Sequence, residues 1–389
     1  MPTPASSNPP AVDRPKRILA LDGGGIRGIF SLQILARIEA LFRQHRNNPD
    51  LLLMDEFDLI AGTSTGAIIA TMLSWGLSVK EIEQHYVDES AAMFTKSSWS
   101  QRWKARYTAE NISANFRRFL SEDGEGREPA LLGTKRLHTL LLLIMRNATT
   151  GSAWPVSNNR AARFNDRALE DCNLQIPLWQ LVRASTAAPT FFPPEQIRLG
   201  RQEMIFVDGA ITPYNNPALI AFLMATLPCY HVNWATGVDR LQIVSVGTGR
   251  SRVRLSKDKA RNIHLLDAAL YAIPALLDGM ALDQDLLCRV LGKCDFGEPI
   301  DGELQDLVPE AEGLGPLENR RFRYVRYEHH FRPEEVELMR ATRKNDPLAM
   351  DNLKLIPVLT GIGRRFAESS VRAAHLGLAG APLAAGNGR

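Results

Sequence analysis

Short apolar runs alternate with amphipathic stretches in the first part of the chain. Residues 17–21 form an apolar run that ends at glycines, and residues 57–61 form a second one, as is typical of buried strands. Apolar residues recur at helical spacing over 29–42, and a second helix is predicted over 67–75, before Gly76. Strand, loop and helix therefore follow one another twice, which predicts the start of a parallel α/β sheet.

The rest of the chain continues this alternation less regularly. The apolar pattern is loose over residues 90–127, where we expect an insertion with some helix and a mobile loop. Residues 140–145 are uniformly apolar and predict another central strand, although the run also fits a helix. Further strands are predicted over 204–207, 241–246 and 322–327, and further helices over 178–188, 264–291, 334–342 and 352–372.

These elements predict an α/β fold with a mainly parallel central sheet and C-terminal helices packed on it. The first residues are rich in Pro, Ser and Thr, and the last are rich in Ala and Gly, so both ends are expected to lack fixed structure. The expected division is a disordered leader over 1–15, an α/β core over 16–250, a mainly helical part over 251–376 and a flexible tail over 377–389.

Composition and charge exclude several classes of protein. Of the 389 residues, 45% are hydrophobic and 23% are charged, which excludes a fully disordered or collagen-like chain. The 46 basic and 43 acidic residues leave a net charge of +3, so no DNA or RNA binding is expected. Four well-separated cysteines form no zinc or redox motif. No signal-peptide pattern and no apolar run of roughly 18 residues is present, so we expect a cytoplasmic protein without a spanning helix.

The first of two glycine-rich turns spans residues 22–28, between a predicted strand and a predicted helix. Its glycines at 23, 25 and 28 satisfy G-x-G-x-x-G, the dinucleotide fingerprint. Exposed backbone N–H groups before a helix suit either a phosphate or an oxyanion. The carboxylate of Asp22 would lie poorly beside a pyrophosphate, which favours an oxyanion hole. A dinucleotide site and a plain structural turn remain as alternatives.

The second turn, residues 62–66, reads G-x-S-x-G between a predicted strand and a predicted helix. This is the context of a nucleophile elbow, in which small neighbours let a serine occupy a strained turn with its hydroxyl exposed. The start of the following helix favours developing negative charge. Ser64 is therefore the candidate nucleophile, and a serine in a glycine-rich packing turn is the alternative.

A serine nucleophile needs a base. None of the eight histidines lies in a turn of catalytic type. Asp208 ends a predicted buried strand and precedes Gly209, and active sites of open α/β sheets lie at such strand ends. Position alone therefore makes Asp208 a candidate base. An α/β-hydrolase triad of Ser64, Asp208 and a later histidine, such as His231 or His264, is the alternative.

Four motifs in this order resemble those of the patatin-like phospholipases. The resemblance covers roughly residues 16–250, and the four signals together are highly specific. The matching segments are D-G-G-G-I-R-G at 22–28, G-T-S-T-G at 62–66, A-S-T-A-A-P at 184–189 followed by Phe192 and Pro193, and D-G-A at 208–210.

This resemblance implies a three-layer α/β/α fold and a Ser–Asp dyad, with Ser64 as nucleophile and Asp208 as base. It implies hydrolysis of membrane glycerophospholipid esters through an acyl-serine, with neither metal nor cofactor. Arg27 matches the family's basic position and would orient the loop or meet a lipid phosphate. The implied oxyanion hole consists of backbone N–H groups around Gly23, Gly24, Gly25 and Ile26.

Two further segments bear on membrane approach and control. Residues 99–107 mix aromatic and basic side chains and suit either an anionic membrane surface or a solvated helix. The basic run over 250–261 suits either phosphates or a solvated loop. Some bacterial proteins that resemble this chain are effectors activated by cyclic oligonucleotides, so an activator of that class is one candidate partner. A non-catalytic lipid-binding or storage protein is the alternative from another functional class.

Overall fold

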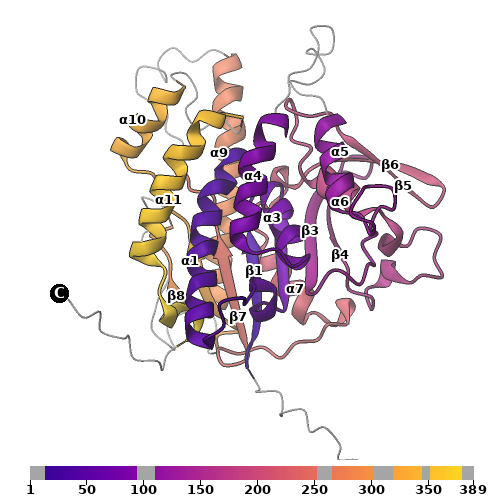
Figure 1. Ribbon diagram of the computed structural model, residues 1–389, viewed down its shortest axis with the longest axis horizontal. Coiled ribbons are helices and arrows are strands. Elements are labelled where there is room, and N and C mark those ends of the chain that lie inside the picture. Colours follow the sequence, from indigo (N-terminus) through magenta and orange to yellow (C-terminus); the bar gives the residue numbers. More distant parts are fainter. Residues whose placement is uncertain are drawn as a thin grey trace, which may run out of the picture.

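A sheet of nine strands runs through the computed structural model, which describes residues 14–93, 110–251, 265–300, 303, 319–343 and 351–378 (Figure 1). The strand order is β5–β6–β3–β2–β1–β7–β9–β8, and β4 pairs with β3 off this path. The strands are β1 Lys16–Leu21, β2 Leu59–Thr63, β3 Leu140–Asn147, β4 Ser152–Ser157, β5 Glu195–Leu199, β6 Gln202–Asp208, β7 Leu241–Val246, β8 Lys293–Phe296 and β9 Arg323–Tyr327.

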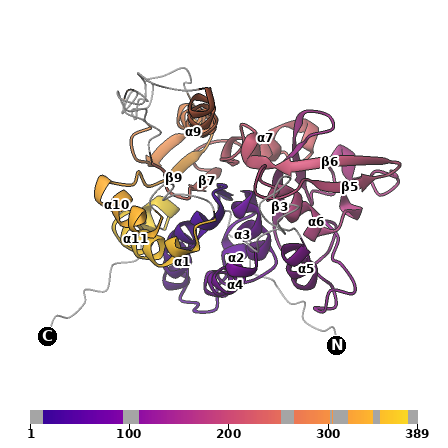
Figure 2. The ribbon, with the colours of Figure 1, turned by 90° about the horizontal axis from the view of Figure 1, so that it is seen from above.

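Helices cover both faces of this sheet. Figure 2 shows α1, α3, α4 and α11 on one face and α7 and α9 on the other. The helices are α1 Gly28–Arg46, α2 Leu53–Glu56, α3 Thr65–Ser74, α4 Val79–Met93, α5 Glu110–Phe119, α6 Leu178–Ser185, α7 Ala218–Thr226, α9 Leu265–Leu291, α10 Pro333–Thr342 and α11 Ile356–Ser370. Two short 3-10 helices, η1 Gly25–Arg27 and η4 Gly209–Ile211, lie at the site described below.

The central strands are buried on both faces, which explains their uniformly apolar sequences. Every residue of β2 and β7 is buried, as is every residue of β1 after Lys16. Side chains alternate between two cores along β1: Leu19 and Leu21 pack towards α1, whereas Ile18 and Ala20 pack towards α7. These two cores on either side of one sheet are the three-layer α/β/α arrangement that the sequence predicts.

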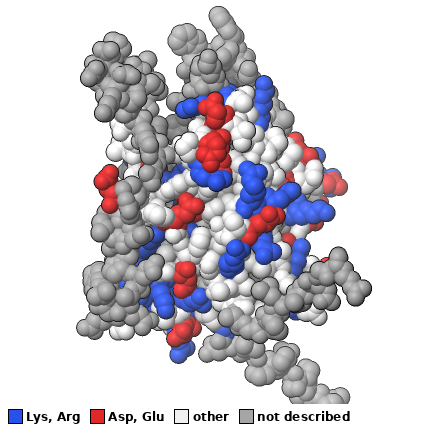
Figure 3. All heavy atoms as spheres, turned by 90° about the vertical axis from the view of Figure 1, so that its left-hand side faces the viewer, with Lys and Arg blue, Asp and Glu red and all other residues white. Residues whose placement is uncertain are grey.

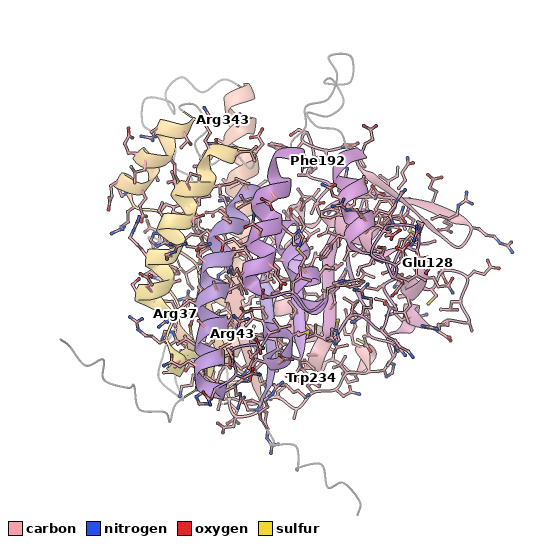
Figure 4. All side chains as sticks on the ribbon, viewed as in Figure 1. Arg37, Arg43, Glu128, Phe192, Trp234 and Arg343 are labelled. Carbon is pink, nitrogen blue, oxygen red and sulfur yellow. The ribbon has the colours of Figure 1, made fainter. Side chains whose placement is uncertain are left out.

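The sheet is mostly parallel, also as predicted. The pairs β1–β2, β1–β7, β2–β3, β7–β9 and β8–β9 are parallel, and the antiparallel pairs all involve β3 or β6. The parallel strands finish at one end of the molecule. Figure 4 places the labelled Phe192 at that end and Trp234 at the opposite end, where β1 begins.

The junction of β2 and β6 positions the site. β4 pairs with one edge of β3, so β2 and β6 share the other edge. Along that edge Thr63 pairs with Ile144, and the next residue of β3, Met145, pairs with Asp208. Because β6 runs antiparallel to β2, the carboxyl ends of the two strands meet tip to tip.

Most predicted elements are confirmed, and residues 140–145 form a strand rather than a helix. The sequence pattern does not predict β4, β5, β8 and α7, nor the four-residue helix α2 and the helix α4, which is rich in polar residues. The first three are short and lie in or near the periphery of the sheet, and α7 is too uniformly apolar to display helical periodicity. The predicted insertion does contain helix, since α5 lies within it. The following predicted features lie outside the described residues: the leader up to residue 13, the aromatic and basic segment 99–107, the basic run from 252 and the tail from 379.

The C-terminal segment is part of the sheet as well as a layer on it. β9 pairs in parallel with β7, and β8 pairs with β9, so two strands from beyond residue 250 extend the same sheet. Helix α11 lies alongside α1 (Figure 1). On the side of the molecule that carries α10 and α11, the described surface intersperses basic and acidic side chains (Figure 3). Within the described residues, no helix is long and apolar enough to cross a bilayer.

Candidate active site

Ser64 occupies the turn between β2 and α3 in a strained backbone conformation. Its φ is 53° and its ψ is −122°, a combination that non-glycine residues rarely adopt. The turn is tight enough to require glycine on both sides. A Cβ at Gly62 would collide with the Gly66 carbonyl, and one at Gly66 would collide with the backbone of Leu21. These contacts are the physical reason for the G-x-S-x-G spacing.

The hydroxyl of Ser64 donates a hydrogen bond directly to Asp208. Ser64 Oγ lies 2.7 Å from Asp208 Oδ2, and the two side chains come from strand ends 144 residues apart. The second carboxylate oxygen, Oδ1, accepts the N–H of Ala210 at 2.7 Å. Asp208 is only 2% exposed and Ser64 only 7%. Both predicted dyad residues are therefore in contact and nearly sealed from solvent.

Burial changes the acidity of Asp208. Desolvation of the carboxylate raises its pKa to about 6, although the Ala210 N–H, the Ser64 hydroxyl and the charge of Arg183 all act to lower it. A carboxylate with this pKa is ionised at neutral pH and is a stronger base than an ordinary aspartate. Direct proton transfer from Ser64 to Asp208 would need a carboxylate that is more basic than an ordinary aspartate, and the pKa of Asp208 is raised in that direction.

Ser185 fixes the backbone of the nucleophile. The N–H of Ser64 donates to Ser185 Oγ at 3.0 Å, and the Ser185 hydroxyl donates to the Ile144 carbonyl at 2.6 Å. In the same segment, the carbonyl of Ala187 accepts a hydrogen bond from the N–H of Asp208. The segment 184–189 thus anchors both dyad residues. Sequence comparison identified this segment but assigned no chemical role to it, and only the contacts reveal one.

The glycine loop after β1 lies beside the elbow, with Gly25 in the left-handed region at φ 58°. One expectation needs correction: the N–H of Gly23 donates to the Asn215 carbonyl at 3.3 Å, so in this structure it points into the protein and not towards a substrate. Among the described residues, no acceptor pairs with the N–H groups of Gly24, Gly25 and Ile26.

Arg27 folds back over this loop. Its Nε donates to the Gly24 carbonyl at 3.3 Å, and its Nη1 donates to the Gly249 carbonyl at 3.0 Å. Of the two roles that the sequence allows for Arg27, these contacts favour orientation of the loop.

Asp22 is bound by Arg326, a residue that the sequence analysis does not identify. Arg326, on β9, donates from Nη1 and Nη2 to the two carboxylate oxygens of Asp22 at 2.8 and 2.6 Å. The same guanidinium donates to Ser245 Oγ and to Glu328 Oε2, and both Asp22 and Arg326 are buried. Because the partners lie 304 residues apart, no local pattern could have paired them.

A pocket of about 290 Å³ connects these groups. Gly23, Gly24 and Ser64 line it together with the segment after β7 and one side of α9. Part of the glycine turn therefore shares one pocket with the serine, while Gly25 and Ile26 lie outside the lining. This shared pocket favours an oxyanion hole over a dinucleotide site. No histidine of the described residues lines the pocket. His231 is exposed after α7, and His264 lies outside the described residues.

Comparisons with known proteins identify the family of this chain. The family model for patatin-like phospholipase matches residues 19–222, more than half of the 389 residues. Patatin-17 of Solanum cardiophyllum is 26% identical over 252 residues, which is 60% of this chain and 60% of that protein. Patatin-like protein 1 of Arabidopsis thaliana is 29% identical over 274 residues, 64% of this chain and 63% of that protein. The chain thus spans about three-fifths of the length of these relatives.

Among solved structures, VipD from Legionella pneumophila aligns with 92% of this chain and 68% of its own, at 12% identity and a TM-score of 0.37. The family assignment rests on the sequence match and on the four motifs. The chain belongs to the patatin-like phospholipase family.

Proposed function

We propose that this protein is a lipid acyl hydrolase of the phospholipase A type, which uses a Ser64–Asp208 dyad. The observation that carries the proposal is the 2.7 Å hydrogen bond between Ser64 Oγ and a buried Asp208 carboxylate. A nucleophile and its base within hydrogen-bond reach are the minimum that covalent acyl transfer requires. The strained elbow supplies a hydroxyl that lines the pocket, and the adjacent glycine loop supplies anion-binding N–H groups.

The proposed reaction has two acyl-transfer steps. Ser64 Oγ attacks the ester carbonyl while its proton passes to Asp208, and the carbonyl oxygen becomes an oxyanion. Collapse of this intermediate breaks the ester C–O bond, and the departing lysolipid oxygen takes the proton from Asp208. Water then attacks the acyl-serine, giving its proton to Asp208, and the second collapse releases the fatty acid and returns the proton to Ser64.

We assign the oxyanion to the N–H groups of Gly24, Gly25 and Ile26, since these lack acceptors among the described residues. Each oxyanion donor is typically worth about 3 kcal/mol of transition-state stabilisation. The N–H of Ser64 does not take part, because Ser185 already accepts it.

The proposed substrate is a membrane glycerophospholipid, which the protein would approach from the bilayer surface by peripheral contact. The family to which the chain belongs supports this substrate class. A cyclic oligonucleotide activator is a narrower hypothesis and is tested separately below.

The test is fatty-acid release from mixed phosphatidylethanolamine and phosphatidylglycerol vesicles, with EDTA present. Wild type is compared with Ser64→Ala and Asp208→Asn, and both variants are expected to lose at least about 10⁴-fold in rate. Ser369→Ala and Asp283→Asn change the same residue types on α11 and α9, away from the pocket lining, and should keep wild-type rates. Full activity in Ser64→Ala would refute the dyad.

Two further arms separate the alternatives. Loss of several decades in rate on His231→Ala or His264→Ala would indicate a triad. If wild type is silent, a panel of cyclic di- and trinucleotides is added, and Ser64 is labelled with a fluorophosphonate. Labelling indicates an enzyme that awaits activation. Vesicle binding with neither labelling nor acyl release, in wild type as in Ser64→Ala, indicates a lipid-binding role.

A further inference from the structure

Three consecutive carbonyls of the glycine loop each accept a hydrogen bond from a side chain. The Thr248 hydroxyl donates to the Gly23 carbonyl at 3.3 Å, and Arg27 Nε donates to the Gly24 carbonyl at 3.3 Å. The Tyr86 hydroxyl donates to the Gly25 carbonyl. The three donors belong to different parts of the fold: the turn after β7, the loop itself and α4.

Peptide geometry turns these three contacts into a constraint on three N–H groups. In a planar trans peptide the C=O and N–H bonds point in opposite directions. The carbonyls of residues 23, 24 and 25 share their peptide units with the N–H groups of Gly24, Gly25 and Ile26. A side chain that holds each carbonyl on one side therefore directs the following N–H to the other side. These are the same N–H groups that lack an acceptor among the described residues.

Such a constraint matters because the loop is made of glycine. Glycine has access to more backbone conformations than any other residue, so an unsupported triple-glycine segment would sample many orientations of its peptide planes. An oxyanion hole lowers the barrier only if its donors are already aimed at the developing charge. The loop restrains part of itself, since the N–H of Arg27 donates to the Gly24 carbonyl at 3.2 Å and the N–H of Gly28 donates to the Gly25 carbonyl. The side chains of Thr248 and Tyr86 add contacts from elsewhere in the fold.

Tyr86 is the most informative of the three donors, since α4 carries no recognised motif. Its side chain is 5% exposed, and its hydroxyl lies 2.7 Å from Thr65 Oγ1. The single phenolic proton is used on Gly25, so Thr65 donates to Tyr86 in turn. Burial raises the pKa of Tyr86, which keeps the phenol protonated. Tyr86 thus connects the glycine loop to the residue that follows the nucleophile.

We infer that Tyr86 and Thr248 are positioning residues that orient the oxyanion-hole N–H groups through the carbonyls of Gly25 and Gly23. This inference rests on the proposed hydrolase function. Tyr86 lies outside the pocket lining, and Thr248 lines the pocket but donates its hydroxyl to the Gly23 carbonyl. Their contribution is expected in the transition state and not in substrate binding, so kcat should fall while KM stays the same.

The test uses a soluble ester, p-nitrophenyl butyrate, and the full chain. Tyr86→Phe and Thr248→Val each remove one hydroxyl and are expected to lower kcat about 10- to 100-fold, with KM within about twofold of wild type. The pH at half-maximal rate should stay the same, because Asp208 is not altered. Thr248→Ser keeps the donor and should recover most of the rate. Tyr327→Phe is the matched control: it removes another buried phenol, bonded to His375 at 3.1 Å, on β9.

A wild-type kcat in both Tyr86→Phe and Thr248→Val would overturn the inference, as would equal losses in Thr248→Ser and Thr248→Val. If Tyr86→Phe does not fold, the two Thr248 variants decide. If wild type does not hydrolyse the ester, fluorophosphonate labelling of Ser64 decides whether the proposed function fails, and the orientation is read from hydrogen exchange of the peptide covering residues 22–28. That peptide should then exchange faster in Tyr86→Phe than in wild type or Tyr327→Phe, and unchanged exchange would refute the inference.

Discussion

The two glycine-rich turns of the site lie at the ends of adjacent parallel strands, yet they are stabilised in different ways. At the elbow, Gly62 and Gly66 approach neighbouring backbone so closely that no side chain fits. Among the described residues, Ser185 is the side chain that adds a hydrogen bond to the backbone of Ser64, the candidate nucleophile. In the loop after β1, by contrast, side chains from α4, β9 and the turn after β7 bind the backbone or the flanking Asp22.

The difference reflects what each turn does. The elbow must hold one atom, the serine oxygen, and close backbone packing between β2 and α3 achieves this locally. The glycine loop must aim several N–H groups at once, and glycine by itself does not restrict their directions. A rigid turn can therefore be specified by its own residues, whereas an oriented row of donors needs support from distant elements.

The largest expected effect concerns the ion pair between Asp22 and Arg326, which holds the start of the glycine loop. Arg326→Met removes the partner of Asp22 and leaves a buried carboxylate unpaired, which typically costs about 3–5 kcal/mol of unfolding free energy. Urea denaturation measures it. The double variant Asp22→Asn with Arg326→Met should recover part of the loss, because residue 22 is then uncharged and Glu328, the other carboxylate bonded to Arg326, still accepts the N–H of Gly249 at 2.8 Å. A loss below about 1 kcal/mol in the single variant would show that the loop does not depend on β9.

Next in size is the elbow. Gly66→Ala places a methyl group against the carbonyls of Leu21 and Asp22, and these backbone atoms cannot move independently of β1. We expect about 3 kcal/mol of destabilisation and loss of fluorophosphonate labelling of Ser64. Gly279→Ala, in α9, is the matched control, since nothing lies within 4 Å of its added methyl. Normal labelling in Gly66→Ala would mean that the elbow tolerates a wider turn than its contacts imply.

The third prediction concerns the energetic cost of burying Asp208 beside the elbow. Folding raises the pKa of Asp208 from 3.8 to about 6, so wild-type stability falls as pH rises through this interval. Asp208→Asn has no charge to bury and should be more stable than wild type at pH 8, by up to about 3 kcal/mol. Near pH 4 the advantage should vanish. Denaturant unfolding at the two pH values checks this, and an equal difference at both would contradict it.

A smaller effect is expected in the glycine loop itself. Gly25 has φ 58°, a left-handed conformation that costs an L-residue about 1–2 kcal/mol. Gly25→Ala should lose that much free energy of unfolding. If the loop orients the oxyanion donors, the kcat of the folded variant should fall as well. Gly151→Ala, at φ 75° with nothing within 4 Å, is the matched control and should lose stability without losing kcat. Equal activity in the two variants would weaken the distinction between the two turns.

The smallest effect is the pH dependence of the rate. The ionised form of Asp208 is the base, so kcat/KM should rise about tenfold per pH unit up to about pH 6 and level off above it. The positive charge of Arg183 lowers the pKa of Asp208. Arg183→Met should therefore move the midpoint of this rise to higher pH. A midpoint near pH 4 in wild type would mean that the carboxylate is more solvated than its burial implies.

Both glycine-rich turns and most strands and helices of the core are predictable from sequence, because each depends on residues close together in the chain. Apolar runs identify β1, β2 and β7, and the glycine spacing identifies Ser64 and its neighbours. Asp208 was also predicted, though for an incomplete reason. The expectation placed it among parallel strand ends, whereas β6 is antiparallel and meets β2 tip to tip across the edge of β3. A single short apolar run does not indicate whether its strand is parallel or antiparallel to its neighbours.

By itself the sequence determined which residues could react: the serine in its elbow, the aspartate at a strand end and the row of glycine N–H groups. Tertiary structure alone decided which distant residues hold them. Tyr86 reaches Gly25 across 61 residues of sequence, Thr248 reaches Gly23 across 225, and Arg326 reaches Asp22 across 304. Tight turns depend on local steric exclusion, which a few adjacent residues express. The orientation and charge balance of buried polar groups depend on partners that only the folded sheet brings within hydrogen-bond distance.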